Sequence, residues 1–435
     1  MSEGTPDTAT FAPFARQQLI DWWDQNSLAA ARVLVVGAGA LGNEVLKNLA
    51  LVGVGQIYIV DFDSIEPSNL SRAVLFRNSD AGQGLKAQVA AERVAQLNPY
   101  AAAHVAYFHG DMVWELGAGV YRGVDVVLGC LDNVEARRCL NFFAYKAGTP
   151  WIDGGIDKLS GSVSFFTGAE TEACYECGMT DRLRRLADAR YSCMSGVVRS
   201  RILSGHEPTT QTTAAIIAAI QSQEAIKVCH AMPIPGGRRL YYNGLLHNFD
   251  SADPSVTTLT DLRRDDQCFC HQDGRFSEVA VADLTNTSSV AELLAYSRAV
   301  LGFTDPVMRM LTHPSALGRN YVLDATCTRC GYATVIGRPA YKVRDTDVIC
   351  PTCPFICPNC GHESVGAPVC PACNVVDRPT MQLRRLHQLD GASPYVSLRL
   401  SDLGLPNLDI VELVEDAHRR FVQIGSHLDL VFTRV

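Results

Sequence analysis

Three regularly spaced glycines are the first residues in this sequence that could do chemistry. Gly37, Gly39 and Gly42 form a G-x-G-x-x-G pattern between the apolar run VLVV and a helical pattern. Glycines let the backbone turn tightly and approach a phosphate, and the N-terminus of the following helix offers free N–H groups to the anion. Asp61 ends the next apolar run, where a carboxylate can bind ribose hydroxyls. Together these residues predict a bound nucleotide.

Polar residues after Asp61 indicate which nucleotide is bound. Asn69 and Arg72 follow within a few residues, and Lys86 comes soon after them. A nicotinamide-dependent dehydrogenase needs an apolar slot here, whereas these cations could neutralise a triphosphate. Asp132 stands just past a strand, where open α/β sheets bind ligands and where a carboxylate can hold Mg2+. The predicted ligands are therefore ATP and Mg2+.

Less specific interpretations of the same residues stay open. Arg72 or Lys86, taken singly, could be a solvated surface charge. Asp132 and Asn133 could simply cap the helix that follows them. Only the order of all these residues along the chain favours a triphosphate site over the simpler interpretations.

The cysteines predict metal centres. The chain has 16 of them, and they include five C-x2-C pairs. In a long chain without a recognisable signal peptide, this pattern predicts zinc in a reducing cytoplasm rather than disulfides. Since zinc takes four donors in a tetrahedron, two C-terminal centres are expected: Cys327, Cys330, Cys350 and Cys353 in one, and Cys357, Cys360, Cys370 and Cys373 in a zinc ribbon. Interleaved pairing, 327/330 with 357/360, is the alternative. We expect these centres to scaffold a protein-binding surface.

The elements that must position these residues alternate between strand and helix. Expected strands cover 33–36, 56–61, 103–108, 124–129 and 150–153, and expected helices cover 41–52, 84–97, 133–147 and 212–230. The strands are nearly continuous apolar runs, as in a parallel sheet covered on both faces. The sequence therefore predicts an α/β fold: a doubly wound, Rossmann-like nucleotide-binding domain over 31–250, after an N-terminal helical segment at 1–30.

Beyond this domain the signals are weaker. Residues 251–320 predict a helical linker region, and 321–380 predict a zinc-binding region whose folding depends on metal. Residues 381–435 alternate apolar and polar positions between turn signals, which predicts a small β-rich module.

Composition narrows the class of protein. A chain of 435 residues with 47% hydrophobic and 19% charged residues is typical of a globular protein of two or three domains. A net charge of -8 argues against nucleic acid as the main partner. No targeting or membrane-spanning segment is visible, so we expect a cytoplasmic protein with no membrane partner.

The ordered motifs resemble one known family. The adenylation domain of the ubiquitin-activating-enzyme superfamily is similar over about residues 11 to 250, through VVGAGALGNEVLKNLALVGVG, DFDSIEPSNLSR, GLKAQVAAERVAQLNP, CLDNVEAR and CYECGM. That superfamily includes the enzymes that adenylate the thiamine and molybdopterin sulfur-carrier proteins. The resemblance implies ATP, Mg2+ and a carrier protein whose C-terminal carboxylate attacks the α-phosphate with loss of pyrophosphate.

The resemblance also implies residue roles. It assigns ribose binding to Asp61, phosphate contacts to Asn69, Arg72 and Lys86, and Mg2+ to Asp132, with Asn133 and Arg137 in the same motif. Arg16, in FARQQLIDWW, resembles the arginine that family dimers extend to their partner's ATP, which implies a homodimer. One position departs from the family pattern SNLxRQ, because Ala73 stands where Gln is usual.

A further zinc site follows from the resemblance. Cys174 and Cys177 match the first half of the superfamily's common structural zinc site. Its second half is usually another C-x2-C pair, but QCFCH here offers Cys268, Cys270 and, as an alternative donor, His271. Four thiolates, or three thiolates and one imidazole, would complete a tetrahedral site.

Cys193, in RYSCMSGVVRS, is the candidate nucleophile. Family members that bond covalently to their carrier place a cysteine ahead of the equivalent helix. Arg190 and Arg199 could lower the pKa of this thiol, and a thiolate attacks an acyl-adenylate readily because AMP is a good leaving group. A structural thiol in a loop is the alternative.

The leading hypothesis is an enzyme that adenylates the C-terminal glycine of a ubiquitin-like protein and then forms a thioester on Cys193. The β-rich tail is similar to the ubiquitin-fold modules that recruit conjugating enzymes, the expected next partner. One alternative is a sulfur-carrier adenylyltransferase of the thiamine or molybdopterin type. The others are a nicotinamide-dependent oxidoreductase and a non-catalytic zinc scaffold. The sequence leaves the carrier and the final acceptor open.

Overall fold

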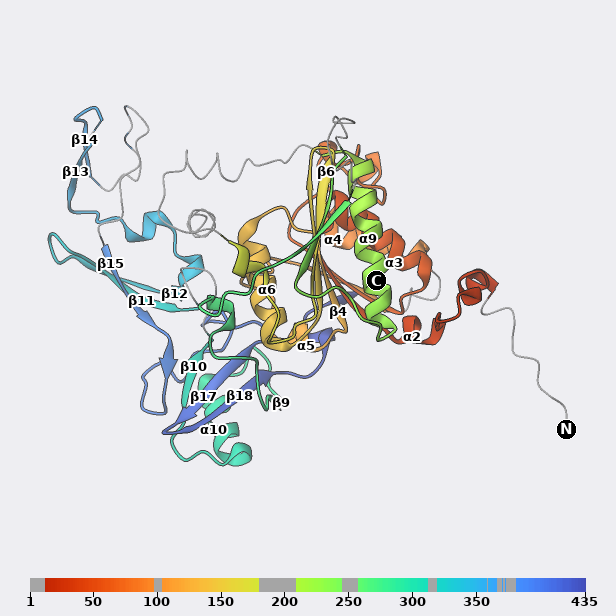
Figure 1. Ribbon diagram of the computed structural model, residues 1–435. Helices are drawn as coiled ribbons and strands as arrows, with labels where there is room; N and C mark the ends of the chain where they lie inside the picture. Colours follow the sequence, from red (N-terminus) through yellow and green to blue (C-terminus); the bar gives the residue numbers. More distant parts are fainter. Residues whose placement is uncertain are drawn as a thin grey trace.

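The computed structural model describes residues 12–97, 104–179, 209–244, 257–311, 319–357, 359–365, 370, 372 and 381–435. Its largest sheet has the strand order β19-β3-β2-β1-β4-β5-β6-β7-β8 (Figure 1). The strands on which the candidate site depends are β1 (Arg32–Val36), β2 (Gln56–Asp61), β3 (Val105–His109), β4 (Val126–Gly129) and β5 (Trp151–Asp157). Their mutual pairings are all parallel. Antiparallel strands β6 (Ser160–Phe166), β7 (Arg238–Tyr242) and β8 (Thr257–Asp261) extend the sheet.

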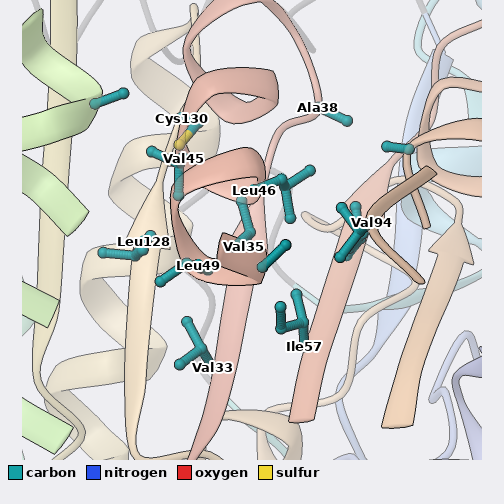
Figure 2. Close-up of a cluster of buried hydrophobic side chains, with 14 of the residues drawn as sticks. Val33, Val35, Ala38, Val45, Leu46, Leu49, Ile57, Val94, Leu128 and Cys130 are labelled. Atoms are coloured by element: carbon teal, nitrogen blue, oxygen red, sulfur yellow. The ribbon is translucent and has the colours of Figure 1, made fainter. Parts of the chain in front are cut away.

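Helices cover both faces of this sheet. One face carries α3 (Ala40–Val52), α4 (Lys86–Leu97) and α9 (Gln211–Cys229), and the other carries α5 (Gly119–Arg122) and α6 (Val134–Ala147) (Figure 1). Alternate residues of β1 enter opposite cores: Val33 and Val35 pack with α3, whereas Leu34 and Val36 pack with α6. Figure 2 shows the first core, where Val45 and Leu49 of α3 lie against β1. The predicted doubly wound Rossmann-like fold is confirmed.

The expectation of a helical linker over 251–320 is wrong for most of its described residues. Strand β8 belongs to the large sheet, and β9 (Ala280–Ala282) and β10 (Val307–Met310) belong to a second sheet. Helix α10 (Val290–Leu301) is the one α-helix in the described part of this stretch. Short strands whose partners lie far along the chain produce too little periodicity to be recognised.

The cysteine-rich region is built from short strands. Strands β11 (Tyr321–Cys327), β12 (Ala333–Pro339) and β15 (Met381–Leu386) form one sheet, and β13 (Pro354–Ile356) and β14 (Glu363–Val365) form a separate hairpin. The tip of this region lies away from the large sheet (Figure 1). The described cysteines of this region therefore lie on turns and at strand ends.

The C-terminal residues are β-rich, but their sheet extends beyond 381–435. Its order is β16-β10-β17-β18-β9, where β16 is Gln388–Leu389, β17 is Ile410–Glu415 and β18 is His418–Ile424. Strands β9 and β10 are contributed from before the cysteine-rich region. We call this sheet together with α10 the C-terminal module.

The last strand, β19 (Thr433–Arg434), leaves the C-terminal module and pairs with β3 at the edge of the large sheet. Phe432 packs on Tyr58 of β2, with ring centroids 5.0 Å apart. The end of the sequence is therefore part of the Rossmann-like core. Among the described helices, none combines the length and apolar character that crossing a bilayer requires.

Candidate nucleotide site and metal centres

The glycine turn leaves the N-terminus of α3 open. Gly37 has φ +98°, and a Cβ on it would lie 2.3 Å from the carbonyl oxygen of Cys130. A Cβ on Gly42 would lie 1.9 Å from the carbonyl oxygen of Gly37. Gly39 caps α3, and a Cβ there would meet no atom within 4 Å among the described residues. Two glycines thus allow the turn to close, while the third faces open space suited to an anion.

Asp61 lies at the end of β2 and holds the glycine turn. Its Oδ2 accepts a hydrogen bond from Ala38 N at 2.7 Å, and its Oδ1 accepts one from Asp63 N at 2.8 Å. Burial raises the pKa of Asp61, although Lys86 nearby favours the charged form. The predicted ribose carboxylate is therefore also a structural support of the glycine turn.

Lys86 and the segment before Asn69 are held side by side. Lys86 begins α4, and its Nζ lies 2.8 Å from Oδ2 of Asp63. The backbone N–H of Ile65 donates to Gly84 O at 2.8 Å, which joins the two segments. The sequence analysis did not identify Asp63, although a second carboxylate two residues after Asp61 was a visible signal.

The side chains of Asn69 and Arg72 differ in whether they are hydrogen-bonded within the protein. Asn69 Oδ1 accepts a hydrogen bond from Glu66 N at 2.9 Å, so this side chain supports its own turn. Arg72 is half-buried, and its guanidinium has no partner among the described residues. Of the two, Arg72 is the one whose charge is available to an anion.

Asp132 and Asn133 follow β4, and their side chains are in different environments. Asn133 caps α6 by accepting a hydrogen bond from Ala136 N at 2.8 Å, so the capping interpretation is correct for this residue. Asp132 is exposed, and its carboxylate meets Asn133 Nδ2 at 3.4 Å. Its remaining oxygen lone pairs suit a hard cation such as Mg2+.

Arg137 is committed to structure. Its Nε lies 3.1 Å from Oδ1 of Asp153, and its Nη2 donates to the carbonyl oxygens of Leu131 and Gly154. Burial raises the pKa of Asp153, and Arg137 counters this by favouring its carboxylate. Arg137, on α6, therefore joins the segment just after β4 to the middle of β5. Asp153 was missed by the sequence analysis.

The structure does not connect two further predicted site residues, Arg16 and Cys193, with the glycine turn, for different reasons. Arg16 is exposed, and its side chain has no partner in the described ranges. Cys193 falls within 180–208, outside the described residues, together with Arg190 and Arg199. The roles expected for these residues stay predictions.

The first cysteine centre brings together two distant segments. The Sγ atoms of Cys174, Cys177 and Cys268 all lie within 4.8 Å of one another, with 3.7 Å from Cys174 to each of the others. Thiolates about 2.3 Å from a zinc ion would be separated by similar distances. The three thiols therefore fit one zinc ion.

Two residues compete for the fourth position of this centre. His271 Nε2 lies 3.8 Å from Cys177 Sγ. Cys270 Sγ is fully buried and receives a hydrogen bond from Asn141 Nδ2 at 3.2 Å, and it is not in the group of three. Both donor sets, with Cys270 or with His271, remain compatible with zinc.

The C-terminal cysteines fall into two groups in chain order. Cys327, Cys330, Cys350 and Cys353 form one group, with Cys327–Cys353 and Cys330–Cys350 sulfur distances of 3.7 and 3.6 Å. Cys357, Cys360 and Cys370 form the other, and Cys373 lies outside the described residues. The interleaved alternative, which needs 327/330 beside 357/360, is not the arrangement in the structure.

Several known proteins are similar to this chain. The sequence profile of the ThiF family matches residues 13–270. A molybdopterin-synthase adenylyltransferase of Salmonella typhimurium is 32% identical over 231 residues, which are 53% of this chain and 85% of that protein. A SUMO-activating enzyme subunit 2 of Dictyostelium discoideum is 38% identical over 153 residues, 35% of this chain and 22% of that protein. A crystal structure of E. coli MccB overlaps with a TM-score of 0.47 at 20% identity, over 62% of this chain and 74% of that one.

Proposed function

The chain belongs to the ThiF family, and we propose that it uses ATP to adenylate the C-terminal glycine of a ubiquitin-like or sulfur-carrier protein. It is an ATP-dependent adenylyltransferase. The observation that carries this proposal is the open N-terminus of α3 at Gly39, bordered by Asp61 and Lys86. The relatives are adenylyltransferases and activating-enzyme subunits, so the oxidoreductase alternative is not supported.

In the proposed reaction, a carboxylate oxygen of the carrier attacks the α-phosphorus of ATP. A new oxygen–phosphorus bond forms, the bond from the α-phosphorus to the bridging oxygen breaks, and pyrophosphate leaves with that electron pair. Negative charge on the leaving phosphates would be stabilised by Arg72, Lys86 and the N–H groups at the start of α3. Asp61 would bind the ribose, and Asn69 would support the turn that carries Arg72.

Metal ions would assist in two separate ways. Asp132 would hold Mg2+, which neutralises phosphate charge when bound. Zinc would be held by the three cysteine groups and would stabilise the fold, since each group brings thiols from separate segments close together. A reducing compartment such as the cytoplasm would keep these thiols available.

For the fate of the adenylate, we favour thioester formation. The Cys193 thiolate would attack the acyl carbon, AMP would leave, and a thioester would remain for transfer to a conjugating enzyme. The C-terminal module is a candidate surface for that enzyme. Sulfur-carrier activation, without a conjugating enzyme, is the second candidate, because the molybdopterin-synthase adenylyltransferase covers more of this chain than the SUMO-activating subunit does.

A homodimer would complete the site if Arg16 reached the partner's nucleotide. The support is local: Leu19 and Trp22, close to Arg16, are 82% and 40% exposed. Exposed apolar side chains of this size suit an interface between protein chains.

The test is ATP–pyrophosphate exchange with candidate carriers that end in Gly or Gly-Gly, followed by a non-reducing gel. Exchange together with a thiol-labile adduct would support activation for conjugation. Exchange without an adduct would favour simple adenylation of a sulfur carrier. Absence of exchange with every carrier, in protein that is folded and loaded with zinc, would contradict the proposed function.

A further inference from the structure

Asn43 is a buried polar residue in the first turn of α3, directly after the third glycine of the turn. Its side chain is 0% exposed. Its Nδ2 donates to Ala38 O at 2.7 Å and to Gly39 O at 3.0 Å. Its Oδ1 accepts a hydrogen bond from Leu75 N at 2.9 Å. One amide therefore joins the glycine turn to the segment that follows Arg72.

An amide is the group that this position requires. It must donate to two carbonyl oxygens and accept from one N–H, and an Asn side chain does both within one planar group. Leu75 is 3% exposed and Ala73 is 4% exposed, so this part of the segment is buried. Loss of the amide would remove the hydrogen bonds to Ala38 O and Leu75 N, which is costly for buried backbone groups, whereas Gly39 O would still accept from Asn43 N.

The two sides that Asn43 joins carry the two halves of the phosphate site. Ala38 and Gly39 belong to the glycine turn at the open N-terminus of α3, where Ala38 N donates to Asp61 Oδ2. On the other side, Leu75 is three residues beyond Arg72, in a run of turns with hydrogen bonds from Arg72 N to Asn69 O and from Phe76 N to Ala73 O. A shift of one side would change the separation between the turn and the guanidinium.

We propose that Asn43 is a positioning residue that sets this separation and thereby the fit to the triphosphate of ATP. The inference rests on the proposed function. The ribose end has supports that do not involve Asn43: besides its hydrogen bond from Ala38 N, Asp61 is placed by β2 and by its contact with Asp63. Substitution of Asn43 should therefore weaken binding of ATP more than binding of adenosine, which lacks the phosphates.

The test measures the affinities of ATP with Mg2+ and of adenosine by calorimetry, on the full chain loaded with zinc. Asn43→Ala and the similarly sized, uncharged Asn43→Leu should lose at least about tenfold in ATP affinity and change adenosine affinity by less than about twofold. Asn43→Ser, whose hydroxyl keeps part of the hydrogen bonding, should lose less ATP affinity. This variant provides the test if the other two variants do not fold. An equal loss for both ligands, or no loss, would overturn the inference.

Asn48→Ala is the matched control. Asn48 lies on the same helix, but its Nδ2 donates to Ser222 Oγ of α9 at 3.3 Å and not to the nucleotide turn. This variant should lower the melting temperature and keep the wild-type ratio of ATP to adenosine affinity. A changed ratio in this control would show that any loosening of α3 has the effect, and it would also overturn the inference. If the wild-type protein bound ATP but did not catalyse ATP–pyrophosphate exchange, the result would count against the proposed function alone. If it did not bind ATP, the result would overturn both the proposed function and the role of Asn43.

Discussion

Arg319 and Asp409 form a buried ion pair between distant parts of the chain, with Nη1 and Oδ2 2.7 Å apart and side chains 3% and 0% exposed. Asp409 Oδ1 also accepts a hydrogen bond from Ala118 N at 3.2 Å, and Arg319 Nη2 donates to Leu116 O at 3.4 Å. The pair therefore fastens the start of the cysteine-rich region and the C-terminal module to the segment between β3 and α5. The C-terminal half is part of the structural support of the nucleotide-binding domain.

Asp409→Ala should lower the free energy of unfolding by about 3–5 kcal/mol, because it leaves the Arg319 guanidinium buried without its counter-charge. Urea unfolding followed by tryptophan fluorescence measures the change. The control is Asp429→Ala, which breaks the exposed pair with Arg434, 3.0 Å across, and should cost less than about 1 kcal/mol. Equal losses in the two variants would contradict the buried-pair interpretation.

Gly37→Ala and Gly39→Ala should separate folding from binding. An alanine at position 37 has an unfavourable positive φ and meets the backbone of Cys130, so stability should fall by at least about 1–3 kcal/mol. An alanine at position 39 meets open space, so stability should change by less than about 1 kcal/mol while ATP affinity falls. Thermal melts and ATP titrations measure both quantities. Wild-type ATP affinity in Gly39→Ala would place the nucleotide elsewhere.

The KM for ATP should rise as the pH is lowered toward the raised pKa of Asp61. Protonation there removes acceptor capacity that the ribose and two backbone N–H groups share. The effect on folding stability has the opposite sign. Because the pKa of Asp61 is higher in the folded chain than in the unfolded chain, Asp61 contributes most to stability below its unfolded-state pKa. That contribution is lost as the pH rises through the folded-state pKa. Asp61→Asn should have a high KM that varies little with pH in this range. A wild-type profile in Asp61→Asn would remove Asp61 from the site.

The zinc content of the protein should show directly whether the cysteine groups bind zinc. Cys350→Ser should lower the zinc measured by atomic emission by one ion per chain and destabilise the cysteine-rich region, since structural zinc contributes folding free energy. Cys229→Ser is the control, because Cys229 belongs to none of the cysteine groups among the described residues. Unchanged zinc in Cys350→Ser would contradict the assignment.

Cys193→Ala should keep carrier-dependent ATP–pyrophosphate exchange and lose the thiol-labile adduct, because adenylation precedes thiol attack. A non-reducing gel beside the exchange assay separates the two steps. An adduct that persisted in this variant would exclude Cys193 as the acceptor.

Much of the candidate site could be predicted because its determinants are local. The turn at Gly37 and the open position at Gly39 follow from backbone conformation, and Asn133 caps its own helix as its sequence context allows. The family resemblance, the Rossmann-like fold and ATP-dependent adenylation are confirmed by the structure and the comparisons. The Mg2+ role of Asp132 and the thioester role of Cys193 stay predictions.

The sequence by itself thus determined the type and order of the chemical groups. These are three glycines at a turn, a carboxylate at the end of β2, cationic side chains that could bind phosphate, and thiols in pairs. Only the tertiary structure decided which distant groups meet. It placed Arg319 against Asp409, β9 beside β18, and β19 on β3. The physical reason is that local spacing constrains backbone conformation within a few residues, whereas contacts between segments far apart depend on how whole faces pack.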